Sequence, residues 1–283
     1  MNHNCITLPV IEDAINNVAC LFSLPDVYLR IQELMNDSNS DLDDFCKVVS
    51  ADPNLTASVL KIVNSAYFGF TGQVESIHRA LNILGIGPLH DLVLSISAVG
   101  AFSMPDQVIE LSKFWQRGIY CGVLSKLIAE KIKVKDSGNL FVIGLLHEIG
   151  HLLLCFKFPE QSIAVISESE KFNRLPVQIE REFFSIHYGQ VGQKLMQAWN
   201  LPLKFQEVTA FHPEPASASS YRLETSIVHI AQHYAYAKQI NIDPLDLIDP
   251  CAWKMIDFTP ELLNEVLSNA DILSREMGQM ITR

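Results

Sequence analysis

The segment Asp-Pro-Asn-Leu-Thr-Ala-Ser-Val-Leu-Lys-Ile-Val-Asn-Ser-Ala-Tyr, residues 52–67, carries the strongest indication of the fold. Asp52 suits an N-cap, because its carboxylate can accept hydrogen bonds from the first N–H groups of a helix. Pro53 suits the first helical position, where its missing N–H would have no partner. A wide apolar face follows, formed by Leu55, Val59, Leu60, Ile62 and Val63. The segment therefore predicts an amphipathic helix that packs in a helical core.

Helical periodicity continues on both sides of this segment, and alternating strand-like runs are absent. Thr259-Pro260 repeats the cap-and-proline pattern, and Asp41 and Ser76 mark further helix starts. The sequence predicts an all-α fold. Helices are expected at about 8–22, 25–36, 41–50, 53–67, 76–84, 88–101, 106–133, 138–156, 159–171, 176–186, 187–198, 201–211, 220–239 and 260–281, with irregular chain from 213 to 220 and from 241 to 257.

The composition narrows the classes of protein. The chain has 283 residues, of which 48% are hydrophobic, and a formal net charge of -11, which disfavours broad nucleic-acid binding. Its six cysteines form no C-x-x-C pair, and no signal peptide or membrane-spanning run is evident. The apolar stretch 140–156 comes nearest to a membrane span, but His147, Glu148 and His151 interrupt it. We expect a reduced cytoplasmic protein with no membrane segment.

Two blocks of sequence carry a resemblance to a known family. The first consists of Leu24-Pro25, the 52–67 segment, Ile77, Ala80 and Leu84-Gly85. The second consists of Phe114-Trp115, Gly144-Leu145-Leu146-His147-Glu148-Ile149-Gly150, His187-Tyr188-Gly189-Gln190-Val191-Gly192 and Trp199-Asn200-Leu201-Pro202. Over about residues 20–240 the chain resembles the HDOD domain family (HD-related output domain), a degenerate relative of the HD-superfamily metal-dependent phosphohydrolases.

The resemblance implies a helical HDOD fold, in which an N-terminal helical half packs on an HD-like helical half. It places the domain at residues 1–240, with the N-terminal half at about 20–100 and the HD-like half at 101–240. Residues 241–283 then form a C-terminal helical tail. Family membership also implies a role in signalling, often without demonstrated chemistry.

The metal ligands of related HD enzymes are only partly preserved. Those enzymes hold a metal with a histidine, an adjacent His-Asp pair and a distant aspartate, all suitable ligands for iron, manganese or zinc. The resemblance puts Arg117 at the first position, His147-Glu148 at the pair and Gln232 at the last. A guanidinium cannot ligate a cation, and a neutral amide is a weak ligand. We expect Arg117 to form an ion pair with Glu148 in a shared polar pocket.

Two interpretations of this pocket remain open. His187 and His212 fall where some relatives place additional histidines, so that His147, Glu148, His187 and His212 could bind a divalent metal such as iron, zinc or manganese. Alternatively, these residues are vestiges of an enzyme ancestor and serve as caps or as polar groups in the core, with no cofactor.

His147, Glu148 and His151 also match the H-E-x-x-H motif of zinc proteases. That motif works on one continuous helix, with both histidines on the same face. Gly150 is a poor helix former, and an apolar core helix continues beyond His151. The match is therefore interpreted as accidental, with His151 as a further residue of the polar pocket.

The substitutions at 117 and 232 favour a non-catalytic signal-transduction or scaffold protein that binds a protein partner or a small ligand. The alternative is a metal-dependent phosphohydrolase that acts on a nucleotide or a phosphodiester. The tail carries a heptad-like stripe and is expected to pack on its own domain, with a homodimer through 260–281 as the second interpretation. The stripe consists of Leu263, Val266, Ala270, Leu273, Met277 and Met280.

Overall fold

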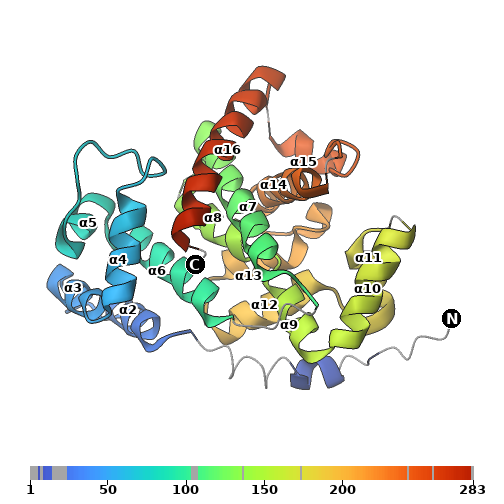
Figure 1. Cartoon of the computed structure of the whole chain (residues 1–283), viewed down its shortest axis with the longest axis horizontal. Coiled ribbons are helices and arrows are strands. Elements are labelled where there is room, and N and C mark those ends of the chain that lie inside the picture. Colours follow the sequence, from blue (N-terminus) through green and yellow to red (C-terminus); the bar gives the residue numbers. More distant parts are fainter. Residues whose placement is uncertain are drawn as a thin grey trace. The chain divides into compact units, whose positions relative to one another are not determined.

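The computed structural model describes residues 6, 9–14, 24–102, 108–135, 137–172, 174–240, 242–256 and 258–281. Within these ranges the regular structure is helical and includes no strand, which confirms the predicted all-α fold (Figure 1). The chain divides into two compact units that interleave along the sequence. The first contains 104–121 and 143–257 with the N-terminal residues 1–23, and the second contains 24–103, 122–142 and 258–283.

The second unit is built from helices whose starts the sequence marks clearly. Asp41 closes a capping box with Asp44, Asp52 accepts from the N–H groups of Asn54 and Leu55, and Ser76 accepts from the N–H of Arg79. The unit contains α2 (Asp26–Asn36), α3 (Leu42–Ser50), α4 (Pro53–Val63), α5 (Ile77–Leu84), α6 (Ile86–Ala101), the later part of α7 (Leu111–Lys131), the start of α8 (Ser137–Leu146) and α16 (Pro260–Ile281).

Helix α4 ends at Val63, earlier than the expected end at residue 67, because Asn64 redirects the chain. The Asn64 side chain donates to the carbonyls of Leu60 and Val74 and accepts from the N–H of Val74. Ser65 donates its hydroxyl to the carbonyl of Ile62. The Asn-Ser pair therefore serves local hydrogen bonding and anchors the loop that leads to α5.

Three of the six residues of the heptad-like stripe in the tail are buried, and the other three are partly exposed. Val266, Ala270 and Met277 on α16 are at most 1% exposed, and α16 contacts α4. Lys131 forms an ion pair with Glu265 at 2.7 Å. The tail thus packs on its own domain, and a homodimer through 260–281 would have to use the other faces of α16.

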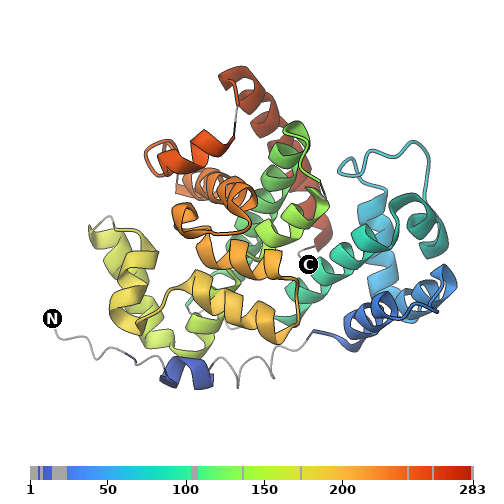
Figure 2. The ribbon, with the colours of Figure 1, turned by 180° about the vertical axis from the view of Figure 1, so that it is seen from behind.

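The first unit contains the helices between residues 149 and 255, drawn from yellow-green to orange-red in Figure 2. It comprises the early part of α7, the end of α8, α9 (Ile149–Lys157), α10 (Pro159–Phe172), α11 (Pro176–Phe184), α12 (Tyr188–Ala198), α13 (Leu203–Phe211), the short 3-10 helix η1 (Pro215–Ser217), α14 (Arg222–Ile240) and α15 (Pro250–Met255).

Helix α12 packs unusually closely against α9 and α13, and glycines make this approach possible. A Cβ atom at Gly150 would lie 1.9 Å from the carbonyl oxygen of Tyr188 and 2.7 Å from the nitrogen of Gly192. A Cβ at Gly189 would lie 2.8 Å from the carbonyl oxygen of Thr209. These distances are too short for any side chain, so the backbones themselves form the contact that positions Tyr188.

Two expectations about this unit are wrong. The single helix expected at 138–156 is broken between α8 and α9. At this break Nδ1 of His147 donates a hydrogen bond to the carbonyl oxygen of Gly144 at 2.6 Å, in competition with the backbone hydrogen bonds of the helix. The stretch 241–257, expected to be irregular, contains α15. Asp249 accepts from the N–H of Cys251, so Asp249-Pro250 is a cap-and-proline start like Asp52-Pro53.

The stretch Ser137–Lys157 is long and apolar enough to cross a membrane by length and composition, contrary to the expectation from sequence. However, 83% of its most apolar window is buried within the protein. Helices α5 and α6 pass the same test only as a pair, and they meet at a bend of 120°. Buried core helices pass this test as well, so the described residues give only weak support for a membrane span.

Candidate functional site

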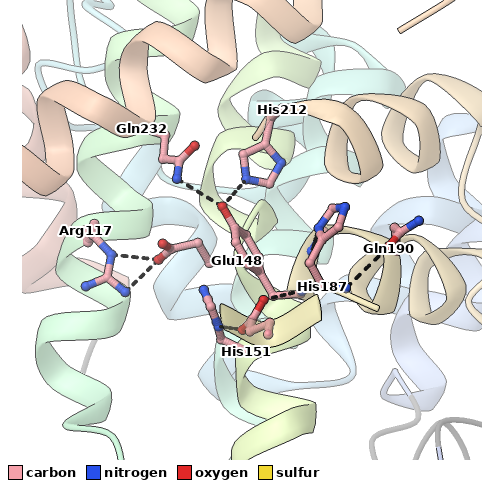
Figure 3. Close-up of polar contacts among 10 residues, drawn as sticks. Arg117, Glu148, His151, His187, Gln190, His212 and Gln232 are labelled. Carbon is pink, nitrogen blue, oxygen red and sulfur yellow. Dashed lines mark hydrogen bonds and ion pairs between the residues drawn. The ribbon is translucent and has the colours of Figure 1, made fainter. Parts of the chain in front are cut away.

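The polar pocket of the first unit is centred on an ion pair between Arg117 of α7 and Glu148, which lies between α8 and α9 (Figure 3). Nε and one terminal nitrogen of Arg117 each lie 2.6 Å from Oε2 of Glu148. The remaining nitrogen donates to Oε1 of Gln239 at 2.6 Å. The side chains are only 14% and 10% exposed. The expected pairing of Arg117 with Glu148 is therefore present, and it uses every nitrogen of the guanidinium group.

The ion pair fixes the charge of Glu148. Burial alone would raise the pKa of this carboxyl, but the adjacent guanidinium of Arg117 lowers the pKa to about 2. Glu148 is therefore ionised at neutral pH, and its negative charge is compensated from within the protein.

His147 is fully buried beside this pair. Its Nδ1 atom bonds to the carbonyl oxygen of Gly144, which makes Nδ1 the protonated nitrogen and leaves Nε2 as an acceptor. Nε2 is buried and has no hydrogen-bond partner. Burial lowers the pKa of His147 below its usual range, so the imidazole is neutral.

Tyr188, at the start of α12, links two of the expected site residues. His212 donates from Nδ1 to the carbonyl oxygen of Thr209, at 2.8 Å, so its Nε2 accepts the Tyr188 hydroxyl at 3.0 Å. Gln232 of α14 donates from Nε2 to the same hydroxyl at 3.0 Å. Burial lowers the pKa of His212 well below its usual range. The tyrosine hydroxyl is thus saturated, and its partners are held in single orientations.

A histidine–carboxylate pair also contacts Tyr188. Nδ1 of His151 lies 2.9 Å from Oε1 of the buried Glu180, whose Oε2 accepts the backbone N–H of Tyr188 at 2.8 Å. The His151 ring stacks on Tyr188 with 3.9 Å between the ring centroids. His151 is therefore oriented from two directions, and its Nε2 atom is its remaining polar group.

His187 has a structural task. Its Nδ1 accepts a hydrogen bond from the backbone N–H of Gly189 at 3.2 Å, and its backbone N–H donates to Oε1 of Gln190. His187 therefore caps helix α12. Burial, with a smaller contribution from Arg181, lowers the pKa of His187 to about 4. This neutral histidine serves as a helix cap, which is one of the two roles considered for it from the sequence.

The candidate metal ligands are not arranged to bind one metal ion together. Glu148 is bound by Arg117, both ring nitrogens of His212 are bonded, and Nδ1 of His187 caps α12. Among the residues that the structure describes, no three side chains of histidine, cysteine, aspartate or glutamate are placed to bind one metal ion. Glu148, His187 and His212 are thus engaged in bonds within the protein.

The H-E-x-x-H match does not have the geometry of a zinc protease. His147 and Glu148 lie in the turn between α8 and α9, whereas His151 lies in α9. Nδ1 of His151 is occupied by Glu180. The two histidines therefore do not share one helical face, as that motif requires.

Sequence analysis missed Tyr188 and Glu180 as members of the site. Tyr188 lies inside a block that the family resemblance covers, but the presence of a tyrosine alone gives no sign of its hydrogen bonds. Glu180 gives a better signal, since it falls on the face of α11 that also holds the buried Val177 and Phe184. A carboxylate on the apolar face of a helix is costly unless it is paired.

A cleft opens beside these residues and encloses about 470 Å³ of atom-free space, part of which is open to solvent. Its lining includes the polar residues Glu148, His151 and Gln232 and the more apolar residues Leu175, Val177 and Tyr236.

The fold agrees with the comparison with known families. The HDOD domain model matches residues 21–215, and the chain belongs to the HDOD domain family. An uncharacterized protein of Treponema pallidum (strain Nichols) is 26% identical over 226 residues, which is 78% of this chain. The aligned region is 42% of the length of that relative, so its activity as a whole does not transfer.

Solved structures show the same fold. An HDOD domain protein of unknown function from Geobacter sulfurreducens has a TM-score of 0.77 and 22% identity, covering 92% of this chain and 93% of its own. A protein described as a candidate phosphohydrolase from Shewanella amazonensis SB2B has a TM-score of 0.76 and 24% identity, covering 95% and 98%. A candidate signal transduction protein from Marinobacter aquaeolei VT8 has a TM-score of 0.69 and 21% identity, covering 92% of this chain and 59% of its own.

Proposed function

We propose that this HDOD domain is a non-catalytic signalling module that acts in the cytoplasm by binding a partner, either another signalling protein or a small ligand. The observation that carries the proposal is the position of the Arg117 guanidinium. It lies 2.6 Å from the Glu148 carboxylate, the group that a metal-dependent hydrolase of this fold would need for its metal. A fixed organic cation there neutralises the carboxylate but cannot activate a water molecule as a metal does.

The other polar groups support the same proposal. A hydrolase needs a nucleophile or a general base within hydrogen-bond reach of the substrate. His212 and Tyr188 are saturated by each other, by Thr209 and by Gln232. Their bonds stabilise the junction of α12, α13 and α14, so their arrangement needs no chemistry to explain it.

A hydrolysis assay tests this proposal against the phosphohydrolase alternative. Untagged protein is incubated with bis(p-nitrophenyl) phosphate and added Mn²⁺, Fe²⁺ or Zn²⁺, beside a Glu148→Gln variant. We expect the wild type to release nitrophenol no faster than the variant. Release by the wild type that the variant lacks, with both proteins folded, would establish the hydrolase instead.

A further inference from the structure

A short helical segment near the start of the chain packs on the first unit. This segment, which we call the strap, consists of Ile6 and the helical residues 9–14, and its helix is the separate blue turn beside the N-terminal trace in Figure 1. Within 9–14 only Ile11 is fully buried, with 0% of its surface exposed, whereas the adjacent Val10 is 52% exposed. The strap therefore docks through one apolar anchor.

The face that receives Ile11 belongs to α9 and α12 and to the residue that follows α9. We call this face the α9–α12 groove, and it consists of Leu153, Leu154, Phe158 and Val191. Leu153, Leu154 and Val191 are at most 3% exposed with the strap in place. A small cavity remains between Ile11 and the groove, so the strap does not fill the groove completely.

Two polar contacts hold the strap beside its anchor. Oε1 of Glu12 lies 2.8 Å from Nζ of Lys194 on α12, and the N–H of Ile6 donates to the carbonyl oxygen of Phe183 at 2.8 Å. The side chains of Lys194 and Glu12 are 34% and 45% exposed, so their ion pair contributes little to docking. A helix of six residues is also unstable by itself in water. These features favour a strap that docks reversibly.

We propose that the α9–α12 groove is an interaction surface for a short amphipathic helix of a partner protein, and that the strap occupies this surface as a detachable internal ligand. When the strap leaves, the apolar side chains of the groove face solvent, and an exposed apolar patch of this kind is suited to binding. This inference goes beyond the proposed function, because the groove shares no residue with the lining of the polar cleft.

The strap itself indicates the chemistry that a partner helix needs. An aliphatic side chain must enter the groove, as Ile11 does, and an acidic side chain must follow it to pair with Lys194. Lys157 also borders the cavity, so the rim of the groove carries positive charge, whereas Glu12 and Asp13 give the strap two negative charges. The partner that fits is an acidic helical segment with one large aliphatic anchor.

A labelled peptide of residues 6–16, titrated with the full chain and followed by fluorescence anisotropy, tests the proposal. In the wild type the strap competes with the peptide, which lowers the apparent affinity by the fraction of chains whose groove is open. Ile11→Asp in the full chain removes the anchor and opens the groove. We expect this variant to bind the peptide at least about tenfold more tightly than the wild type does. Val10→Asp changes an exposed neighbour and should bind the peptide as the wild type does.

A charge reversal places the peptide in the groove. In the Ile11→Asp chain, adding Lys194→Glu should weaken the peptide about fivefold, which corresponds to the upper range for an exposed ion pair. A peptide that carries Glu12→Lys should recover this loss in the same chain. A peptide that carries Ile11→Asp should bind none of these proteins.

The proposal is overturned if Ile11→Asp and the wild type bind the peptide equally, if neither binds it, or if the Glu12→Lys peptide recovers no affinity. It is also overturned if circular dichroism shows that Ile11→Asp unfolds the whole protein, because the strap would then be part of the core. These outcomes do not involve hydrolysis. Failure of the proposed non-catalytic function would show separately, as Glu148-dependent cleavage of a phosphodiester.

Discussion

Replacing Gly150 with alanine is expected to destabilise the protein by about 4 kcal/mol or more, enough to unfold a large share of it. The added Cβ would lie 1.9 Å from the carbonyl oxygen of Tyr188 and 2.7 Å from the nitrogen of Gly192. Because both atoms belong to the backbone of α12, no side chain can rotate away, and α9 and α12 must separate. Chemical denaturation followed by circular dichroism measures the loss.

Gly278→Ala is the matched control for this substitution. It also replaces a helical glycine, but its new Cβ would have no atom within 4 Å. Alanine is the better helix former by roughly 1 kcal/mol, so this variant should be as stable as the wild type or slightly more stable. Equal stability of Gly150→Ala and Gly278→Ala would contradict the close packing of α9 on α12.

Replacing Arg117 with leucine is expected to lower the free energy of unfolding by about 3 kcal/mol, because it leaves the Glu148 carboxylate buried without its cation. The Arg117→Leu/Glu148→Leu double variant should recover much of that loss, since it removes both charges. A double-mutant cycle with Glu148→Leu, measured by urea denaturation, gives the coupling between the two side chains.

Arg181→Leu is the control for the loss of an arginine. Arg181 also holds a carboxylate with two nitrogens, at 2.6 and 2.7 Å from Glu214, but these side chains are 42% and 44% exposed. Exposed ion pairs contribute at most about 1 kcal/mol, so this variant should be nearly neutral. If Arg117→Leu were as mild as Arg181→Leu, the buried pair would not stabilise the pocket.

The contribution of the Arg117–Glu148 pair also depends on pH in a defined direction. The pKa of Glu148 falls from 4.5 to about 2 in the folded protein. A lowered pKa stabilises the folded state fully above pH 4.5 and loses that stabilisation as the pH falls towards 2. The stability of the wild type relative to the double variant should therefore fall as the pH is lowered over this acidic range.

The sequence predicted the fold well where local chemistry determines it. Asp41, Asp52 and Ser76 cap helices as expected, because an N-cap needs only its own side chain and the next few residues. The break in the helix at His147 was missed, because it depends on which backbone carbonyl the histidine side chain donates a hydrogen bond to. Asp249-Pro250 did carry a visible signal for α15, of the same kind as Asp52-Pro53.

The site could be predicted in part from the family resemblance rather than from local chemistry. The family resemblance put Arg117 and Glu148 at two ligand positions of the same site, and opposite charges at such neighbouring positions predict an ion pair. The hydrogen bonds of Tyr188 to His212 and Gln232 join residues 24 and 44 positions apart. Such contacts depend on how α12, α13 and α14 pack, which periodicity does not reveal.

A Mn²⁺ titration followed by electron paramagnetic resonance tests most directly whether Arg117 takes the place of a metal at Glu148. The wild type should leave added Mn²⁺ free at micromolar concentrations, with the same spectrum as the Glu148→Gln variant. Stoichiometric binding of Mn²⁺ by the wild type that Glu148→Gln abolishes would contradict the account.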